Sequence, residues 1–158
     1  MIAINHVPDV PSADTSRANT TEITLFATEA VAEGDHLIID TAVTTKGMGL
    51  HVKKSTAAAG GGGETRGGAL TSAASGDPVR VRTGGIQDNV KLATGVVAGD
   101  QLVPDSSSAG RLMKAAAADG TAAAAFVIAN RVVARCVVAE SGNRGTVEWL
   151  TFAGGVQG

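Results

Sequence analysis

The sequence predicts a mainly β protein: a small β-barrel or sandwich with an extended N-terminal arm and at most one or two short helices. Gly-Asp and Gly-Asn pairs recur before short apolar runs, and such pairs favour turns that start a strand. Apolar and charged side chains alternate over residues 78–83, as they do along a strand with two unequal faces. Glycine supplies 21 of 158 residues and aromatic residues only 3%, which suits tight turns and closely approaching strands.

Bulk composition narrows the classes of function. A chain of 158 residues is the length of one domain. A net charge of -2 with no basic run argues against a nucleic-acid partner. Cys136 is the only cysteine, which excludes an intrachain disulfide and favours a small buried side chain. The N-terminus has no signal-peptide pattern, and no apolar run approaches about 18 residues. We therefore expect a soluble cytoplasmic chain with no membrane partner.

Residues 1–20 form the expected N-terminal arm. Pro8 and Pro11 forbid a regular helix across them. The segment is nevertheless richer in apolar side chains than a disordered tail usually is. An extended arm that lies on a partner and a frayed terminus are equally compatible with this pattern. The apolar side chains of the arm are those of Ile2, Ile4, Val7 and Val10.

The remainder, residues 21–158, is expected to form a single β domain. Residues 111–133 are ambiguous because alanine favours helices, but Asp119-Gly120 suits a turn between two strands. Residues 135–152 indicate a hairpin with its turn near Gly142-Asn143. The other expected strands lie at residues 22–27, 36–40, 51–54, 76–86 and 86–94.

A glycine-rich stretch at residues 57–68 interrupts this series. Four consecutive glycines cost too much backbone entropy to lie inside an element, so we expect a mobile surface loop. The alternative is a phosphate-binding loop. That motif requires a lysine after its last glycine, and Ala69 follows here.

The stretches AVAEGDHLIID at residues 30–40 and GVVAGDQLVPD at residues 95–105 are near-repeats. We interpret both as a turn followed by a strand, in which glycine takes a positive φ and aspartate bonds nearby backbone. The alternative is a carboxylate cluster for acid–base chemistry or metal binding, but nothing in the spacing brings the aspartates together. The pairs assigned to turns are Gly34-Asp35, Gly76-Asp77 and Gly99-Asp100, with Gly142-Asn143 as a looser case.

The other screens for chemistry find nothing. The three histidines match no metal-ligand spacing, and the sequence has no nucleophile elbow. No catalytic residue, metal ligand or cofactor is predicted, and we do not expect an enzyme. Arg80 and Arg82 share one face of their predicted strand. That face is either simply solvated or directed at a protein partner.

Residues 76–152 carry a resemblance to a known family. The order GDPVRVRTGGI, GVVAGDQLVPD, GRLMKAA, AAFVIANRVVA and GTVEWL resembles that of the small capsid decoration (cement) proteins of tailed bacteriophages. The resemblance covers about the C-terminal half. It implies a β-tulip or barrel domain that forms homotrimers on the outer surface of the expanded capsid, after assembly in the host cytoplasm. It also implies that the arm residues Ile2, Ile4, Val7 and Val10 contact the capsid.

Three functions follow from the sequence. The leading one is a structural virion protein that clamps neighbouring major capsid proteins and stabilises the head against internal DNA pressure. The second is a virion-surface adhesin or head-fibre base that binds the host surface. The third is a small hydrolase that uses Asp35, Asp77 and Asp100, which we disfavour for the reasons above.

Overall fold

The computed structural model describes residues 21–44, 50–56, 65–105, 107–115 and 132–150. Within these ranges the chain forms nine β-strands and no helix, which confirms the mainly β class. None of the described residues belongs to a helix long and apolar enough to cross a membrane. The strands are β1 (Thr21–Ala27), β2 (His36–Ile39), β3 (His51–Lys54), β4 (Thr65–Ala69), β5 (Pro78–Lys91), β6 (Gln101–Pro104), β7 (Leu112–Lys114), β8 (Ala134–Ser141) and β9 (Arg144–Trp149).

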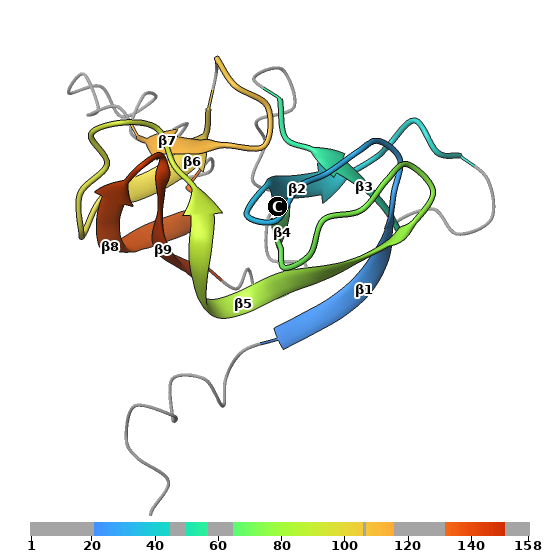
Figure 1. Ribbon diagram of the computed structural model, residues 1–158, viewed down its shortest axis with the longest axis horizontal. Helices are drawn as coiled ribbons and strands as arrows, with labels where there is room; N and C mark the ends of the chain where they lie inside the picture. The colour runs from blue at the N-terminus through green and yellow to red at the C-terminus, as the bar shows by residue number, and fades with distance from the viewer. Residues whose placement is uncertain (1–20, 45–49, 57–64, 106, 116–131, 151–158) are drawn as a thin grey trace, which may run out of the picture.

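The first five strands close into a barrel, which we call barrel 1 (Figure 1). Its order is β1-β3-β2-β4-β5, and β5 pairs back onto β1. The β1–β3 pair is parallel and the other four pairs are antiparallel. Alternate side chains of the strands point inward and exclude water from a common core. That core consists of Leu25, Ala27, Val31, Leu37, Val52, Ala69, Val79 and Val81.

A second barrel, barrel 2, has the strand order β5-β9-β8-β6-β7. A parallel bridge between Leu92, just after β5, and Leu112 of β7 completes its circle. The buried residues of this barrel form a separate cluster around Trp149. That cluster consists of Val90, Leu92, Val96, Leu102, Leu112, Val133, Ala134, Cys136, Val147 and Trp149.

Strand β5 belongs to both barrels and connects them (Figure 1). Its pairing with β1 ends at Gly84, and its pairing with β9 begins at Gly85. The sequence analysis expected two strands here. Gly85 has a φ of 79°, a conformation that glycine adopts without steric cost. The strand therefore bends at Gly85, but the chain does not turn back, and β5 continues from barrel 1 into barrel 2.

The expected loop at residues 57–68 is wrong at its C-terminal end, because residues 65–68 belong to strand β4. A side chain at Gly67 would collide with the carbonyl of Arg82, and one at Gly68 would collide with Gln87 and Trp149. These two glycines therefore let β4 approach β5 closely. Residues 57–64 lie outside the described residues, as does the expected turn at Asp119-Gly120.

The two barrels have the same connectivity. In each barrel the first strand pairs with the third in parallel and with the fifth in antiparallel fashion, the second pairs with the third and fourth, and the fourth pairs with the fifth. The near-repeats of the sequence occupy the same place in both barrels, just before the second strand. Gly76-Asp77 and Gly142-Asn143 likewise precede the fifth strand of each. The described part of the chain thus consists of two five-stranded units of the same connectivity that share β5.

Candidate functional site

The Gly-Asp turns before β2 and β6 have the same geometry. Gly34 has a φ of 85° and Gly99 a φ of 91°. The N–H of Asp35 donates to the carbonyl of Ala32, and that of Asp100 to the carbonyl of Val97, each at 3.1 Å. Each carboxylate accepts the N–H of the same residue in return, at 2.7 Å and 2.9 Å. Both aspartates thus close a turn with backbone and side chain together.

Each of these carboxylates also binds a lysine. Asp35 lies 2.5 Å from Nζ of Lys91, and Asp100 lies 2.8 Å from Nζ of Lys114. The hydrogen bond from Lys114, followed by that from the Val97 N–H, lowers the pKa of Asp100 below its usual value. Gly76 has a φ of 89° and introduces β5, where the carbonyl of Asp77 accepts the N–H of Ala27 at 3.0 Å.

The three aspartates therefore lie in three separate turns. No group of three or more His, Cys, Asp or Glu side chains that could hold a metal occurs among the described residues. The arrangement gives no support to the hydrolase alternative, because acid–base chemistry on one substrate needs converging groups.

The turn of barrel 1, Ala32–Asp35, contacts β5 and β9. We call this region of contact between the two barrels the junction. The carbonyl of Gly34 accepts the N–H of Lys91 in β5 at 2.9 Å. Asn89 donates to the Glu33 carboxylate at 2.9 Å. Nη1 of Arg144 donates to the carbonyls of Glu33, at 3.0 Å, and Asn89, at 2.8 Å. This turn thus binds β5 and β9 at the level of barrel 2, whereas Gly99 in the equivalent turn is exposed.

Buried polar groups line the same junction. His36 of β2 is fully buried, and both of its ring nitrogens lack a hydrogen-bond partner. Burial penalises the charged imidazolium and lowers the pKa of His36 to about 3. The indole N–H of Trp149 donates to Oε1 of Gln87 at 2.8 Å, and the Gln87 amide donates to the carbonyl of Ala69 at 3.0 Å. These bonds connect strands of both barrels.

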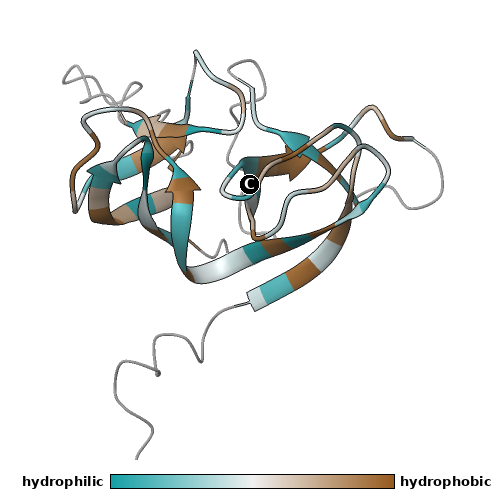
Figure 2. Ribbon diagram, viewed as in Figure 1, coloured by the Kyte–Doolittle hydropathy of each residue, from teal (hydrophilic) through white to brown (hydrophobic). Residues whose placement is uncertain are grey.

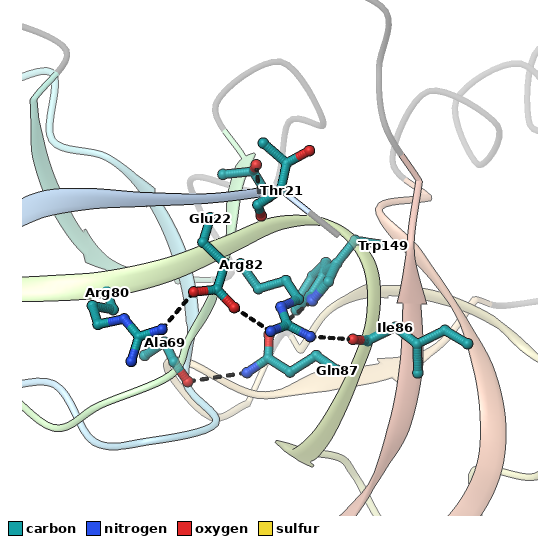
Figure 3. A network of polar contacts seen from close by, with 9 residues as sticks. Thr21, Glu22, Ala69, Arg80, Arg82, Ile86, Gln87 and Trp149 are labelled. Atoms are coloured by element: carbon teal, nitrogen blue, oxygen red, sulfur yellow. Dashed lines mark hydrogen bonds and ion pairs between the residues drawn. The ribbon is translucent and has the colours of Figure 1, made fainter. Parts of the chain in front are cut away.

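Arg80 and Arg82 converge on Glu22 of β1 (Figure 3). The Arg80–Glu22 ion pair measures 2.5 Å. Arg82 binds the other carboxylate oxygen and also donates to the carbonyl of Ile86 at 2.7 Å. Hydrogen bonds from Arg82 and then Arg80 lower the pKa of Glu22. The sequence interpretation of these arginines as partner-facing stays a prediction, and Arg80, with 59% of its side chain exposed, is the one accessible to a partner.

Two further aspartates occupy equivalent positions just after β2 and β6. The Asp40 carboxylate accepts from Nζ of Lys53 at 3.1 Å, and the Asp105 carboxylate from Nε of Arg111 at 2.5 Å. Burial alone would raise the pKa of Asp105, but hydrogen bonds from Ser107 and Arg111 outweigh burial, so that the pKa is lowered. Each aspartate thus fixes a loop to a basic residue at or beside the third strand of its barrel.

The sequence analysis missed most of the junction. It named neither His36, Gln87 nor Trp149 as a group with a role, because their contacts join residues far apart in the chain. The sequence signal available was the isolated histidine inside the apolar run HLII. Cys136 is buried with a free thiol, whose pKa is raised by burial and then by Asp100. The arm residues Ile2, Ile4, Val7 and Val10 lie outside the described residues.

Comparisons with known proteins bear on the fold. No protein-family model matches the chain, and no curated protein matches it. Among solved structures, the chain is similar to the N base of the head fiber protein gp8.5 in bacteriophage phi29, with a TM-score of 0.55 and 13% sequence identity. The match covers 84% of this chain and 95% of that chain. At this identity the likeness is one of fold.

Proposed function

We propose that this chain is a structural protein of a phage virion, bound to the outer capsid surface as the base of a head fibre. The observation that carries the proposal is the fold likeness to the phi29 head fiber base, which extends over almost the whole of that base. The resemblance of residues 76–152 to capsid decoration proteins supports the same location independently. Both comparisons concern proteins of phage heads.

The construction of the chain suits such a base. The two barrels share β5 and are joined by hydrogen bonds between their strands, so they form one connected unit to which a fibre can be attached. In this proposal the major capsid protein is the partner, and the arm at residues 1–20 makes the contact. An extended segment with spaced apolar side chains can add a strand to an exposed sheet edge of a partner.

Co-sedimentation with purified capsids that lack this protein tests the proposal. We expect the full-length chain to sediment with expanded capsids. Ile4→Asp should weaken binding at least about tenfold, because under the proposal it places a charge in the apolar contact with the capsid. Asn5→Asp is the matched control, since it adds the same charge to the arm at a position that is already polar. Failure of the wild-type chain to bind capsids would overturn the proposal.

An experiment on the same capsids distinguishes the role of a fibre base from that of the clamp that the sequence analysis favoured. A clamp raises the temperature at which the capsid opens, because it binds the closed shell and not the dissociated subunits. A base that is held by a single capsid subunit binds the dissociated subunit equally well, and it therefore leaves this temperature unchanged. Thermal scans of decorated and undecorated capsids therefore distinguish the two roles.

A further inference from the structure

The two barrels follow one another along the chain and are connected at one point. The pairing of β5 with β1 ends at Gly84, and its pairing with β9 begins at Gly85. Among the described residues, the chain therefore passes from barrel 1 to barrel 2 only at Gly84-Gly85 (Figure 1). Neither residue has a side chain that restricts rotation about its backbone bonds. This dipeptide is thus suited to act as a hinge.

Each barrel has an apolar core of its own. The buried cluster of barrel 1 and the buried cluster of barrel 2 share no residue. Figure 2 shows hydrophobic segments in both barrels and a pale stretch of β5 at the bend between them. Burial of apolar side chains is the main favourable contribution to folding. A rotation about the hinge would therefore leave both cores buried, except for the face of Trp149 that contacts His36 of barrel 1.

The bonds across the junction are polar, and water can replace them. The N–H of His36 donates to the carbonyl of Gly110, in the loop between β6 and β7, at 2.7 Å. The N–H of Gly110 donates in turn to the carbonyl of Ser55 at 2.9 Å. The ion pair of Asp35 with Lys91 crosses the junction as well. Because groups released from such bonds bind water instead, each bond contributes only modestly to keeping the junction closed.

Unpartnered polar side chains gather on one face of barrel 1. Ser55 lies opposite His36 and donates its N–H to the carbonyl of His36 at 3.0 Å, and Thr65 lies opposite Ile38. Side chains that are two residues apart or directly opposite share one face of a sheet, so His36, Ser55 and Thr65 lie on the same face. Most of the buried side-chain nitrogen and oxygen atoms without a partner, within the described part of the chain, belong to these three residues. Opening the junction gives these atoms water as a partner, which lowers the cost of opening.

The charged groups around His36 do not favour a protonated imidazole in the closed junction. Lys91 and Arg144 would repel it, and within the described ranges each carboxylate on the elements packed around His36 already has a partner. Charge on this ring is therefore tolerated only where water reaches it. The pairs on these elements are Asp35–Lys91, Asp40–Lys53, Asp105–Arg111, Glu148–Arg135, Glu22–Arg82, Glu33–Asn89 and Asp88–Thr146.

We propose that mild acid opens the junction, so that the two barrels rotate apart about Gly84-Gly85 while each barrel stays folded. In the open form the ring of His36 is in water and binds a proton, and this binding favours the open form. Each pH unit below the ordinary pKa of an imidazole multiplies the ratio of open to closed molecules about tenfold. The inference does not depend on the proposed function.

Quenching of Trp149 fluorescence by acrylamide measures the opening of the junction in the full-length chain, because Trp149 is the only tryptophan. We expect the quenching constant, taken from fluorescence lifetimes, to rise several-fold between pH 7 and about pH 4.5. The rise should reverse when the pH is restored. Far-UV circular dichroism should stay constant over this range. Cys136 should remain slow to react with a dipyridyl disulfide, a reagent that attacks thiols in acid as well.

Two variants assign the effect to His36. In His36→Leu the quenching constant should not depend on pH, and His36→Gln serves the same purpose if His36→Leu does not fold. Asp35→Asn is the matched control, because it removes the other titratable group of the junction and should keep the acid response. An acid response that persists without His36, or that is lost in Asp35→Asn, overturns the proposal. So does a wild type in which Trp149 becomes accessible only together with Cys136 and with loss of the circular dichroism signal.

Discussion

The imidazole of His36 is stacked on the indole of Trp149, with ring centroids 5.7 Å apart and ring planes inclined by 18°. His36 comes from β2 of barrel 1 and Trp149 from β9 of barrel 2, so this contact joins the two barrels. Both nitrogens of the imidazole are buried without a partner. Burial therefore keeps the ring in its neutral form, because a buried imidazolium would have no compensating bond.

We predict that His36 makes the protein sensitive to mild acid. Burial lowers the pKa of His36 to about 3 in the folded chain, from an ordinary value of 6.5. Below pH 6.5 the unfolded state thus binds a proton at His36 that the folded state does not bind. The contribution of His36 to the free energy of unfolding is therefore fully present above pH 6.5. As the pH drops below 6.5, this contribution falls by about 1.4 kcal/mol per pH unit. Urea unfolding between pH 8 and pH 5 measures this slope.

The control for this prediction is His36→Leu, which replaces the imidazole by an apolar side chain of similar volume that cannot titrate. We expect its stability to be nearly constant over the same pH range. At pH 7 it should equal or exceed the wild type, since no unpaired buried nitrogen remains. A slope that survives in His36→Leu would show that another group causes the acid sensitivity.

The Gly-Asp turns permit a comparison between equivalent glycines. Gly34→Ala and Gly99→Ala impose the same strain, because both residues have a positive φ near 90°. That strain costs about 1–3 kcal/mol. Only the alanine at position 34 also collides with Asn89 and Arg144 in the junction. We expect urea unfolding to give a clearly larger loss for Gly34→Ala, and equal losses would show that the junction can relax around the added methyl group.

The turns of this fold were predictable because their chemistry is local. A Gly-Asp pair specifies a positive φ and a carboxylate that bonds residues nearby in sequence, whatever surrounds it. The shared strand β5 was not predictable in this way. Gly84-Gly85 is equally compatible with a turn between two strands, and only the pairing of Gly84 with β1 and of Gly85 with β9 selects a continuous strand.

The contacts of the junction could not be predicted from the sequence, for a related reason. Its bonds connect residues far apart in the chain: Glu33 with Asn89, and Gln87 with Trp149. The near-repeat of the two turns can be recognised in the amino-acid sequence. Whether the glycine of each turn is buried or exposed depends instead on which strands pack beside that turn. Local pattern therefore predicted the repeated unit and not the way the two units pack.

The aspartates after β2 and β6 should contribute unequally. Asp105 has 3% of its side chain exposed and accepts from Ser107 and from Arg111 at 2.5 Å. Asp40 is more exposed, and its ion pair with Lys53 is longer, at 3.1 Å. We expect Asp105→Asn to cost about 1–3 kcal/mol, since a buried charged partner is lost, and Asp40→Asn to cost less because solvent screens its pair. Paired unfolding curves at pH 7 measure both, and a larger loss for Asp40→Asn would contradict the ranking.

The thiol of Cys136 should report on the opening of barrel 2. It is 1% exposed within the apolar cluster around Trp149, and its raised pKa keeps it protonated and therefore poorly nucleophilic. In the native protein at pH 8 we expect a disulfide reagent such as Ellman's reagent to react far more slowly than in 8 M urea. The rate should rise in the same range of urea in which fluorescence of Trp149 changes, because both residues belong to one core. Rapid labelling in buffer without denaturant would mean that barrel 2 opens independently of global unfolding.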